Sequence, residues 1–281
     1  MQLIDGKSLA NKVEKTVASQ VEKLKLEKNI VPGLAVILIG DDPASHAYVK
    51  MKAKACEKVG FYSITHNMPD TISQDEIIAT IEMMNANPRI DGILVQLPLP
   101  KHVDTDKILE VINPRKDVDG FHPYNVGRLV TNLDCFVACT PLGVMKMLEA
   151  YNIDPKGKDV VVVGASNIVG KPMASLLLNA QATVTITHIH TKDLASHTRK
   201  ADIVVVGVGV PGLIKEDMIK DGAIVIDIGI NRIEDGSLVG DVDFENVSKK
   251  CSYITPVPGG VGPMTIAMLL SNTLKAAKAR V

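Results

Sequence analysis

Apolar runs of strand length alternate with amphipathic segments of helical length along the whole chain. In the first half, the spacing predicts helices over 8–29, 43–59 and 75–85, and strands over 34–39, 63–66 and 91–96. In the second half, the strand-length runs are 159–163, 183–187, 202–206 and 223–227. Such short, continuously apolar strands are typical of a parallel sheet covered by helices on both faces. The pattern predicts an α/β protein whose last segment, 264–279, is a helix that packs back on the first half.

Two segments interrupt this alternation. Pro98 and Pro100 follow a predicted strand directly, and the chain must turn there because proline cannot continue a central strand. Residues 113–127 contain too many turn formers for regular structure and are unusually polar for a connector. Loops of this kind often carry function, so we treat 113–127 as a candidate.

Composition narrows the range of partners. The 281 residues can form one large domain or two of ordinary size. A hydrophobic content of 46% and a formal net charge of -1 are typical of a soluble globular protein and favour neither nucleic acid nor a bare membrane surface as a partner. Aromatic residues make up only 3%, which argues against a base-stacking platform. The longest apolar runs, 33–40 and 201–210, are far too short to span a membrane.

The four cysteines favour a reduced, cytoplasmic environment. They form no CxxC pair, and the N-terminus lacks a basic segment followed by an apolar core and a cleavage site. Cys135 and Cys139 lie four residues apart, but no His or Cys pair at ligand spacing accompanies them. We interpret both as buried small hydrophobic residues and predict no metal site.

A glycine-rich turn follows the predicted strand at 159–163 and leads into a helical segment at 173–178. It reads Gly164-Ala-Ser166-Asn-Ile168-Val169-Gly170. A strand, a tight glycine turn and a helix N-terminus offer free backbone N–H groups and a positive dipole end to a pyrophosphate. The turn departs from G-x-G-x-x-G, because Ser166 replaces the second glycine and Gly170 lies one residue late. The segment predicts dinucleotide binding, with an ordinary βα turn as the alternative.

Small residues also follow two later strands. Gly207 and Gly209 end the run at 202–206, and Ile230 lies in the segment after the run at 223–227. An open α/β sheet binds its ligand at the carboxyl ends of its strands, so these three residues join the candidate dinucleotide contacts.

The residues that select the ribose are expected at 188–192, after the second strand of this half. No Asp or Glu is present there to receive two ribose hydroxyls, which argues against a simple preference for NAD. His190 and Lys192 are candidates to pair with a 2′-phosphate, and a solvated loop histidine and lysine are the equal alternative.

One lysine falls on the apolar side of the helix predicted at 43–59. Asp42 is a plausible N-cap and Pro43 the first helical residue. The apolar stripe contains Ala44, Tyr48, Met51, Ala55 and Val59. Lys52 lies within this stripe, one turn after Tyr48. An inward-facing lysine loses hydration and can exchange protons near neutral pH; the alternative is a side chain that reaches solvent past the apolar edge.

Eight blocks, in order along nearly the whole chain, carry a family resemblance. They are SHAYVKMK (45–52), VQLPLP (95–100), KDVDGF (116–121), CTPLG (139–143), GASNIVGKP (164–172), DIGIN (227–231), GDVDF (240–244) and TPVPGGVGPMT (255–265). Together they resemble the bifunctional methylenetetrahydrofolate dehydrogenase/cyclohydrolase family. The resemblance implies a folate-binding catalytic α/β domain over 1–139 and 264–281, and a Rossmann-like, doubly wound dinucleotide domain over 140–263.

The resemblance also implies roles for individual residues. Lys52 would be the essential proton-transfer residue, Tyr48 would pack on the pterin, Gln96 would hydrogen-bond near Lys52, and Asp119 would bind the polar edge of the pterin. Pro258, Gly259 and Gly260 would line the folate cleft, with Thr140 near the domain junction. The resemblance implies NADP as the hydride acceptor. NAD is the alternative, because the loop at 188–192 lacks an arginine. The implied assembly is a homodimer.

Two other functions are alternatives to the one that the resemblance implies. An α/β dehydrogenase acting on an amino or hydroxy acid would share the second domain, but Gln96 and Asp119 speak against it. A non-catalytic dinucleotide-binding sensor would leave an inward Lys52 beside a ligand cleft without evident purpose.

Overall fold

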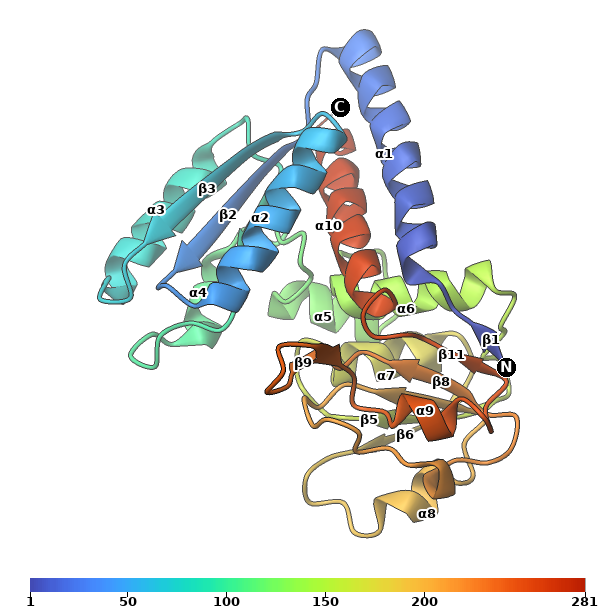
Figure 1. The fold of residues 1–281 in the computed structure, drawn as a ribbon. Helices are drawn as coiled ribbons and strands as arrows, with labels where there is room; N and C mark the ends of the chain where they lie inside the picture. Colours follow the sequence, from blue (N-terminus) through green and yellow to red (C-terminus); the bar gives the residue numbers. More distant parts are fainter. Residues whose placement is uncertain (281) are drawn as a thin grey trace. The chain divides into compact units, whose positions relative to one another are not determined.

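The computed structural model describes residues 1–280 and divides into two compact units (Figure 1). The six-stranded unit contains Met1–Ala10, Leu129–Leu133 and Thr140–Thr265. The three-stranded unit contains Asn11–Arg128, Asp134–Cys139 and the chain from Ile266 onward. Both units are built on parallel sheets, as the continuously apolar strands predict.

The sheet of the three-stranded unit has the order β3 (Tyr62–Met68), β2 (Gly33–Ile39), β4 (Gly92–Val95), and both pairs are parallel. All seven residues of β2 are buried, which explains its unbroken apolar sequence. Helix α2 (Pro43–Lys58) packs on β2 and β3. The other face is covered by α3 (Gln74–Ala86) and α4 (Thr105–Val111). Lys52 and Gln96 belong to elements of this unit.

Short polar side chains start the helices of this unit. Asp42 accepts a hydrogen bond from the Ser45 N–H at 2.7 Å, which confirms the predicted N-cap of α2. Ser73 and Glu76 form a capping box at the start of α3. Asp104 accepts from the Lys107 N–H at 3.2 Å at the start of α4. These caps satisfy donors that the first turn leaves without intrahelical partners.

The sheet of the six-stranded unit is parallel throughout. Its strand order is β1 (Gln2–Leu3), β11 (Tyr253–Ile254), β8 (Ile224–Asp227), β7 (Ile203–Val206), β5 (Asp159–Val163), β6 (Thr183–Thr187). The chain leaves β5 for β6 on one side and then crosses to β7 on the other. The carboxyl ends of β5 and β7 therefore form a topological switch point, where open α/β sheets bind ligands.

Helical segments cover both faces of this sheet (Figure 1). Helix α7 (Gly170–Asn179) packs on β5 and β6. The opposite face packs against a short 3-10 turn, η1 (Glu216–Met218), and the helices α8 (Leu194–Thr198) and α9 (Phe244–Val247). A two-stranded antiparallel ribbon of β9 (Asn231–Arg232) and β10 (Leu238–Val239) follows β8. This layering confirms the predicted doubly wound architecture.

The remaining elements are long or connecting helices. They are α1 (Gly6–Lys28), α5 (Pro123–Val130), α6 (Cys139–Ala150) and α10 (Val261–Lys278). From Ile266 onward α10 belongs to the three-stranded unit, where Asn272 Nδ2 donates to the Val118 carbonyl at 2.8 Å. The predicted return of the terminal helix is confirmed. No helix within residues 1–280 combines the length and apolarity needed to cross a membrane.

The structure differs from the expected organisation in two places. Residues 1–139 were expected in one domain, but β1 joins the six-stranded sheet. The Gln2 N–H donates to the Ser252 carbonyl at 2.7 Å, and the Ile4 N–H donates to the Ile254 carbonyl at 2.9 Å. The segment 113–127 was expected to be irregular, but α5 begins at Pro123. Proline has no N–H to leave unsatisfied at a helix start, and His122 Nδ1 accepts from the Tyr124 N–H at 3.0 Å.

Candidate functional site

Lys52 points into the three-stranded unit. Its side chain lies on the buried face of α2 and is only 9% exposed. Its Nζ donates to Oε1 of Gln96 at 2.9 Å, and Nε2 of Gln96 donates to the Leu97 carbonyl at 2.8 Å. Gln96 directly follows β4, so the carboxyl end of the sheet supplies the acceptor for the lysine. The inward orientation is confirmed, and the alternative of a lysine extending into solvent is wrong.

The apolar stripe predicted for α2 is confirmed in part: Lys52, Ala55 and Val59 are buried and Tyr48 is partly buried. Met51 is 52% exposed and Ala44 is exposed, whereas Val49 and Cys56 are buried. Helix α2 packs on β2 and β3 through the face that carries Val49, Lys52 and Cys56. Spacing alone could not choose between two adjacent apolar stripes, because alanines and a methionine are tolerated on either side.

Asp119 lies close enough to Lys52 for the charges to interact. Burial raises the pKa of the Asp119 carboxyl, the positive charge of Lys52 opposes this rise, and the negative charge of Asp117 adds to it. Cys139 lies beside Asp119, and burial raises the pKa of its thiol well above the ordinary value. The carboxyl, the ammonium group and the Gln96 amide therefore form one polar cluster, in which Lys52 is buried while Gln96 and Asp119 are partly exposed.

The loop that carries Asp119 is held by Asp117. The Asp117 carboxylate accepts hydrogen bonds from the N–H groups of Gly120, Phe121 and His122 at 3.1, 3.1 and 2.9 Å. It also accepts from Asn125 Nδ2 at 2.8 Å. Gly120 has a positive φ of 76°, which glycine adopts without strain. These contacts fix the backbone on both sides of Asp119.

Tyr48 lies one turn before Lys52 on α2 and is partly buried. Burial raises the pKa of its hydroxyl, so the ring is neutral under ordinary conditions. A neutral aromatic ring one turn from the lysine suits stacking on a flat heterocycle.

Two glycine turns meet at the switch point of the six-stranded sheet. Gly164 follows β5 with a φ of 116°, and a Cβ at this position would lie 2.7 Å from the Gly207 carbonyl oxygen, after β7. A Cβ on Gly170 would lie 2.0 Å from the Gly164 carbonyl oxygen, so the start of α7 packs directly on the turn. Such close backbone approaches require glycine, and they leave room for a dinucleotide to contact the main chain.

Ser166 takes up part of the helix N-terminus that was expected to face a pyrophosphate. Its Oγ accepts from the Val169 N–H at 3.2 Å and from the Gly170 N–H at 3.3 Å. Its carbonyl accepts from the Lys171 N–H at 3.0 Å. The expectation that the first helical amides are free is therefore wrong in this structure, because the serine hydroxyl satisfies them.

The remaining candidate dinucleotide contacts occupy the same carboxyl edge of the sheet. Ile230 is 42% exposed, and Gly209 has a φ of 73°. His190 and Lys192 are both exposed in the loop after β6. Exposed apolar and cationic side chains at this edge fit a ligand with a flat ring at one end and a phosphate at the other.

Four further candidates lie near the two ends of the segment Thr140–Thr265 of the six-stranded unit. They are Thr140, Pro258, Gly259 and Gly260. The Thr140 and Thr265 hydroxyls are 2.9 Å apart. Pro258, Gly259 and Gly260 precede α10, and the Gly259 carbonyl accepts from the Lys7 N–H at 2.9 Å. These residues belong to the six-stranded unit, and Lys52, Gln96, Asp119 and Tyr48 belong to the three-stranded unit. A role in lining a folate cleft stays a prediction for Pro258, Gly259 and Gly260, and a dinucleotide contact stays a prediction for Thr140.

Comparison with known proteins assigns both parts of the chain to one protein family. The catalytic-domain profile of the tetrahydrofolate dehydrogenase/cyclohydrolase family matches residues 4–119, and the NAD(P)-binding-domain profile of the same family matches residues 138–281. The chain belongs to this family. The rival assignment to an amino-acid or hydroxy-acid dehydrogenase is thereby excluded.

Relatives of the family are similar over their full lengths. A protein named bifunctional protein FolD, from Sulfurovum sp., is 86% identical over 100% of both chains. The crystal structure of the bifunctional FolD methylenetetrahydrofolate dehydrogenase/cyclohydrolase from Campylobacter jejuni is 58% identical, with a TM-score of 0.98 over 100% of both chains. The Trypanosoma brucei enzyme, complexed with NADP and an inhibitor, is 40% identical, with a TM-score of 0.95 over 99% of this chain and 97% of its own.

Several residues that shape the family site escaped the sequence analysis. Asn272 Nδ2 donates to the carbonyls of Val118 and Val137 at 2.8 and 3.0 Å, which joins the Asp119 loop to the segment before Cys139. A polar residue within the apolar run of α10 is the signal that could have found it. Asp227 and Asp241 in the six-stranded unit belong to the DIGIN and GDVDF blocks, but the sequence alone predicts no individual role for them.

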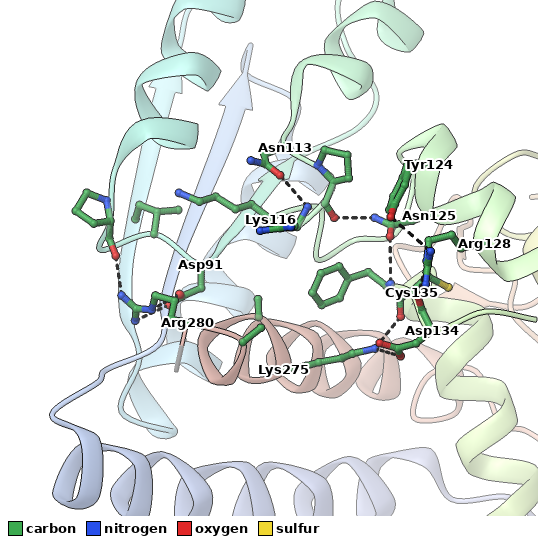
Figure 2. Close-up of a pocket in the computed structure, with 17 residues that line it drawn as sticks. Asp91, Asn113, Lys116, Tyr124, Asn125, Arg128, Asp134, Cys135, Lys275 and Arg280 are labelled. Carbon is green, nitrogen blue, oxygen red and sulfur yellow. Dashed lines mark hydrogen bonds and ion pairs between the residues drawn. The ribbon is translucent and has the colours of Figure 1, made fainter.

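A pocket of about 700 Å³ opens at the amino end of β4 (Figure 2). Lys116 Nζ donates there to the carbonyls of Met84, Asn85 and Asn87 at 3.1, 2.7 and 2.9 Å. Arg280 Nε lies 2.7 Å from Asp91 Oδ1, and Lys275 Nζ lies 2.5 Å from Asp134 Oδ1. These cations are held by acceptors of the protein itself. The pocket is separate from the Lys52 site, because Gln96 follows the opposite end of β4.

No group of three or more His, Cys, Asp or Glu side chains in residues 1–280 is arranged to hold a metal ion. The four cysteines are free thiols, and Cys139 is buried as expected, whereas Cys135 is only partly buried.

Proposed function

We propose that this protein oxidises methylenetetrahydrofolate to methenyltetrahydrofolate with NADP and then hydrolyses the product to formyltetrahydrofolate. Membership of the family supports both reactions. The single observation that carries the proposal is the buried Lys52, hydrogen-bonded to Gln96 and close to the Asp119 carboxyl. A sensor that only binds a dinucleotide has no need for this cluster.

The oxidation requires alignment more than it requires a base. Loss of hydride from the methylene carbon leaves a cation that is delocalised over the two flanking nitrogens. A bound NADP would supply the hydride acceptor. The contribution of the chain is to hold the pterin in place, with Tyr48 against its face and Asp119 on its polar edge, so that the reacting atoms are aligned.

The hydrolysis requires proton transfer. Water adds to the methenyl carbon, and its oxygen loses one proton. As the bond between that carbon and a ring nitrogen breaks, the nitrogen gains a proton and the oxygen loses its second proton, so the formyl group forms and one proton is released overall. Lys52 as the neutral amine accepts the proton that the water loses on addition, and as ammonium it donates a proton to the ring nitrogen. The second proton of the oxygen leaves to solvent. The Gln96 carbonyl oxygen, 2.9 Å from Nζ, holds the lysine in one position during both transfers.

NADP rather than NAD is supported by the loop after β6. It contains no carboxylate in the position that receives two ribose hydroxyls, and it exposes His190 and Lys192. The Trypanosoma brucei relative is complexed with NADP. We therefore propose higher turnover with NADP, and a clear preference for NAD in a comparison of initial rates would contradict this. We also propose that the protein is a cytoplasmic homodimer. The mass of the protein in solution tests the dimeric state.

An absorbance assay of the purified protein tests the main proposal. Methylenetetrahydrofolate is supplied with NADP, and reduced nicotinamide and the methenyl intermediate are followed separately. Reduced cofactor without lasting methenyl accumulation is expected if both reactions proceed. Lasting accumulation would mean a dehydrogenase without efficient hydrolysis, and no reduction at all would overturn the proposal in favour of a dinucleotide sensor.

A further inference from the structure

A carboxylate from a distant part of the chain holds the turn that follows β7. Asp241 is fully buried, and its Oδ2 accepts hydrogen bonds from the Val208 N–H at 2.6 Å and the Gly209 N–H at 3.0 Å. Its Oδ1 accepts from Asn231 Nδ2 at 2.9 Å. One side chain therefore joins the segment after β7 to the segment after β8.

The backbone around Asp241 is built to receive this carboxylate. A Cβ on Gly229 would lie 2.3 Å from Cγ of Asp241, and a Cβ on Gly240 would lie 1.9 Å from Oδ2 of Asp227. Contacts this short exclude any side chain at either glycine. The two glycines of the DIGIN and GDVDF blocks are thus required by two buried carboxylates.

Asp227 supports Asp241 in turn. Its carboxylate accepts from the N–H groups of Gly229, Asp241 and Val242 at 2.9, 3.0 and 2.9 Å. Its own N–H donates to Thr255 Oγ1 at 2.7 Å. The position of the Asp241 side chain is therefore set by a network that begins on β8 and not by the turn it holds.

The turn held by Asp241 lies where half of a dinucleotide would be expected. Gly207 touches the Gly164 turn, and Val208, the next residue, is 39% exposed. The 188–192 loop follows β6, on the other side of β5 from β7. If that loop holds the 2′-phosphate and the Gly164 turn holds the pyrophosphate, the nicotinamide half must extend over the carboxyl ends of β7 and β8.

We propose that Asp241 is a positioning residue for the dinucleotide: it fixes the Val208–Gly209 backbone and the Asn231 amide in the arrangement that receives the nicotinamide half. The inference rests on the proposed function. A carboxylate is needed because three donors converge on its two oxygens. An amide here would direct its own N–H groups at donors and leave the turn without its anchor.

Asp241→Asn tests this role. The KM for NADP in the dehydrogenase assay is expected to rise about tenfold or more, with kcat at saturating NADP changed far less. Direct binding of NADPH, followed by its fluorescence, is expected to weaken by the same factor. The cyclohydrolase rate, started from methenyltetrahydrofolate, uses no dinucleotide and is expected to remain near that of the unaltered protein.

Asp243→Asn is the matched control. It makes the same change of charge two residues further on, but the Asp243 carboxylate accepts from Asn246 Nδ2 at 3.0 Å and lies 3.8 Å from Lys215 Nζ, away from the turn. The KM for NADP is expected to be unchanged. Asn231→Ala removes one of the three donors to Asp241 and is expected to raise this KM by a smaller factor than Asp241→Asn.

The outcomes separate the inference from the proposed function. An unaltered protein that reduces no NADP would overturn the proposed function. An active unaltered protein, together with an Asp241→Asn variant of unchanged KM for NADP, would overturn the role of Asp241. If Asp241→Asn lost both activities by unfolding, the Asn231→Ala variant would decide, and an unchanged KM in that variant would also overturn the role.

Discussion

The two units prepare their functional surfaces in different ways. In the three-stranded unit, side chains form the site: Lys52 on α2 and Gln96 after β4 meet at 2.9 Å, with Asp119 nearby. In the six-stranded unit, the candidate surface is mostly backbone, formed by the turns at Gly164 and Gly207. Proton transfer needs a titratable group, whereas a dinucleotide can be held by main-chain groups, so the difference follows from the chemistry.

The same device supports both surfaces. Asp117 holds the Asp119 loop by accepting three backbone N–H groups, and Asp241 holds the Val208–Gly209 turn by accepting two. A buried carboxylate is costly to desolvate, and several converging N–H donors offset that cost. Substitutions in the two units should therefore affect different reactions, and this can be tested variant by variant.

The largest effect is expected from Lys52→Met, which keeps the length of the side chain but cannot exchange a proton. The rate of hydrolysis is expected to fall by about 10³-fold, while hydride transfer falls far less. The assay should then show lasting methenyl accumulation.

Lys54→Met is the control for this substitution, because Lys54 lies on the exposed side of the same helix. It should leave both rates near those of the unaltered protein. Hydrolysis at an unchanged rate in Lys52→Met would show that the comparison places the chemistry in the wrong unit.

The next largest effect is expected in the pH dependence of the free energy of unfolding, through Asp227 in the six-stranded unit. Burial raises the pKa of Asp227 from its ordinary 3.8 to about 6, opposed by its three N–H donors and increased by Asp241. The stability from this group is fully present below about pH 4 and is lost as the pH rises through about 6, a difference of about 3 kcal/mol. Urea unfolding from pH 4 to 7 should show this loss in the unaltered protein and not in Asp227→Asn.

The other carboxyls titrate in both proteins, so the difference between the two pH profiles isolates Asp227. Asp243→Asn should change the profile in the opposite direction and only slightly, because hydrogen bonding from Asn246 lowers the pKa of the partly exposed Asp243. Parallel profiles for the unaltered protein and Asp227→Asn would contradict the prediction.

Asp119→Ala is expected to weaken folate binding roughly ten- to hundredfold, because the contact that we propose between this carboxylate and the polar edge of the pterin would be lost. The KM for methylenetetrahydrofolate should rise and the KM for NADP should not. Asp106→Ala, an exposed carboxylate near the start of α4, should change neither value. A rise in the KM for NADP alone would break the assignment of Asp119 to folate.

Asn272→Leu should have the smallest effect. Leucine has a similar volume but removes the Asn272 amide that donates to the Val118 and Val137 carbonyls, so the free energy of unfolding should fall by about 1.5 kcal/mol. The KM for folate should rise by less than in Asp119→Ala, and Ser271→Ala should leave it unchanged. Destabilisation without any change in this KM would limit Asn272 to a structural role.

Local patterns predicted most of the fold. The strands at 159–163 and 183–187 have the bounds that the sequence predicts, because a short apolar run between turn formers permits little else. The start of α2 was equally clear, since Asp42 and Pro43 act within one turn. The helix at Pro123 was missed, because its turn-forming residues and a His122 cap resemble a loop in sequence.

The sequence by itself determined most of the element types and, through eight ordered blocks, the family. Only the tertiary structure decided that Lys52 lies on the buried face of α2, that β1 pairs with β11, and that Ser166 occupies the first amides of α7. It also decided that Asp241 reaches the turn after β7, more than thirty residues earlier in the chain. Propensity and periodicity act over a few residues, whereas these contacts join segments that are neighbours only after the sheet has formed.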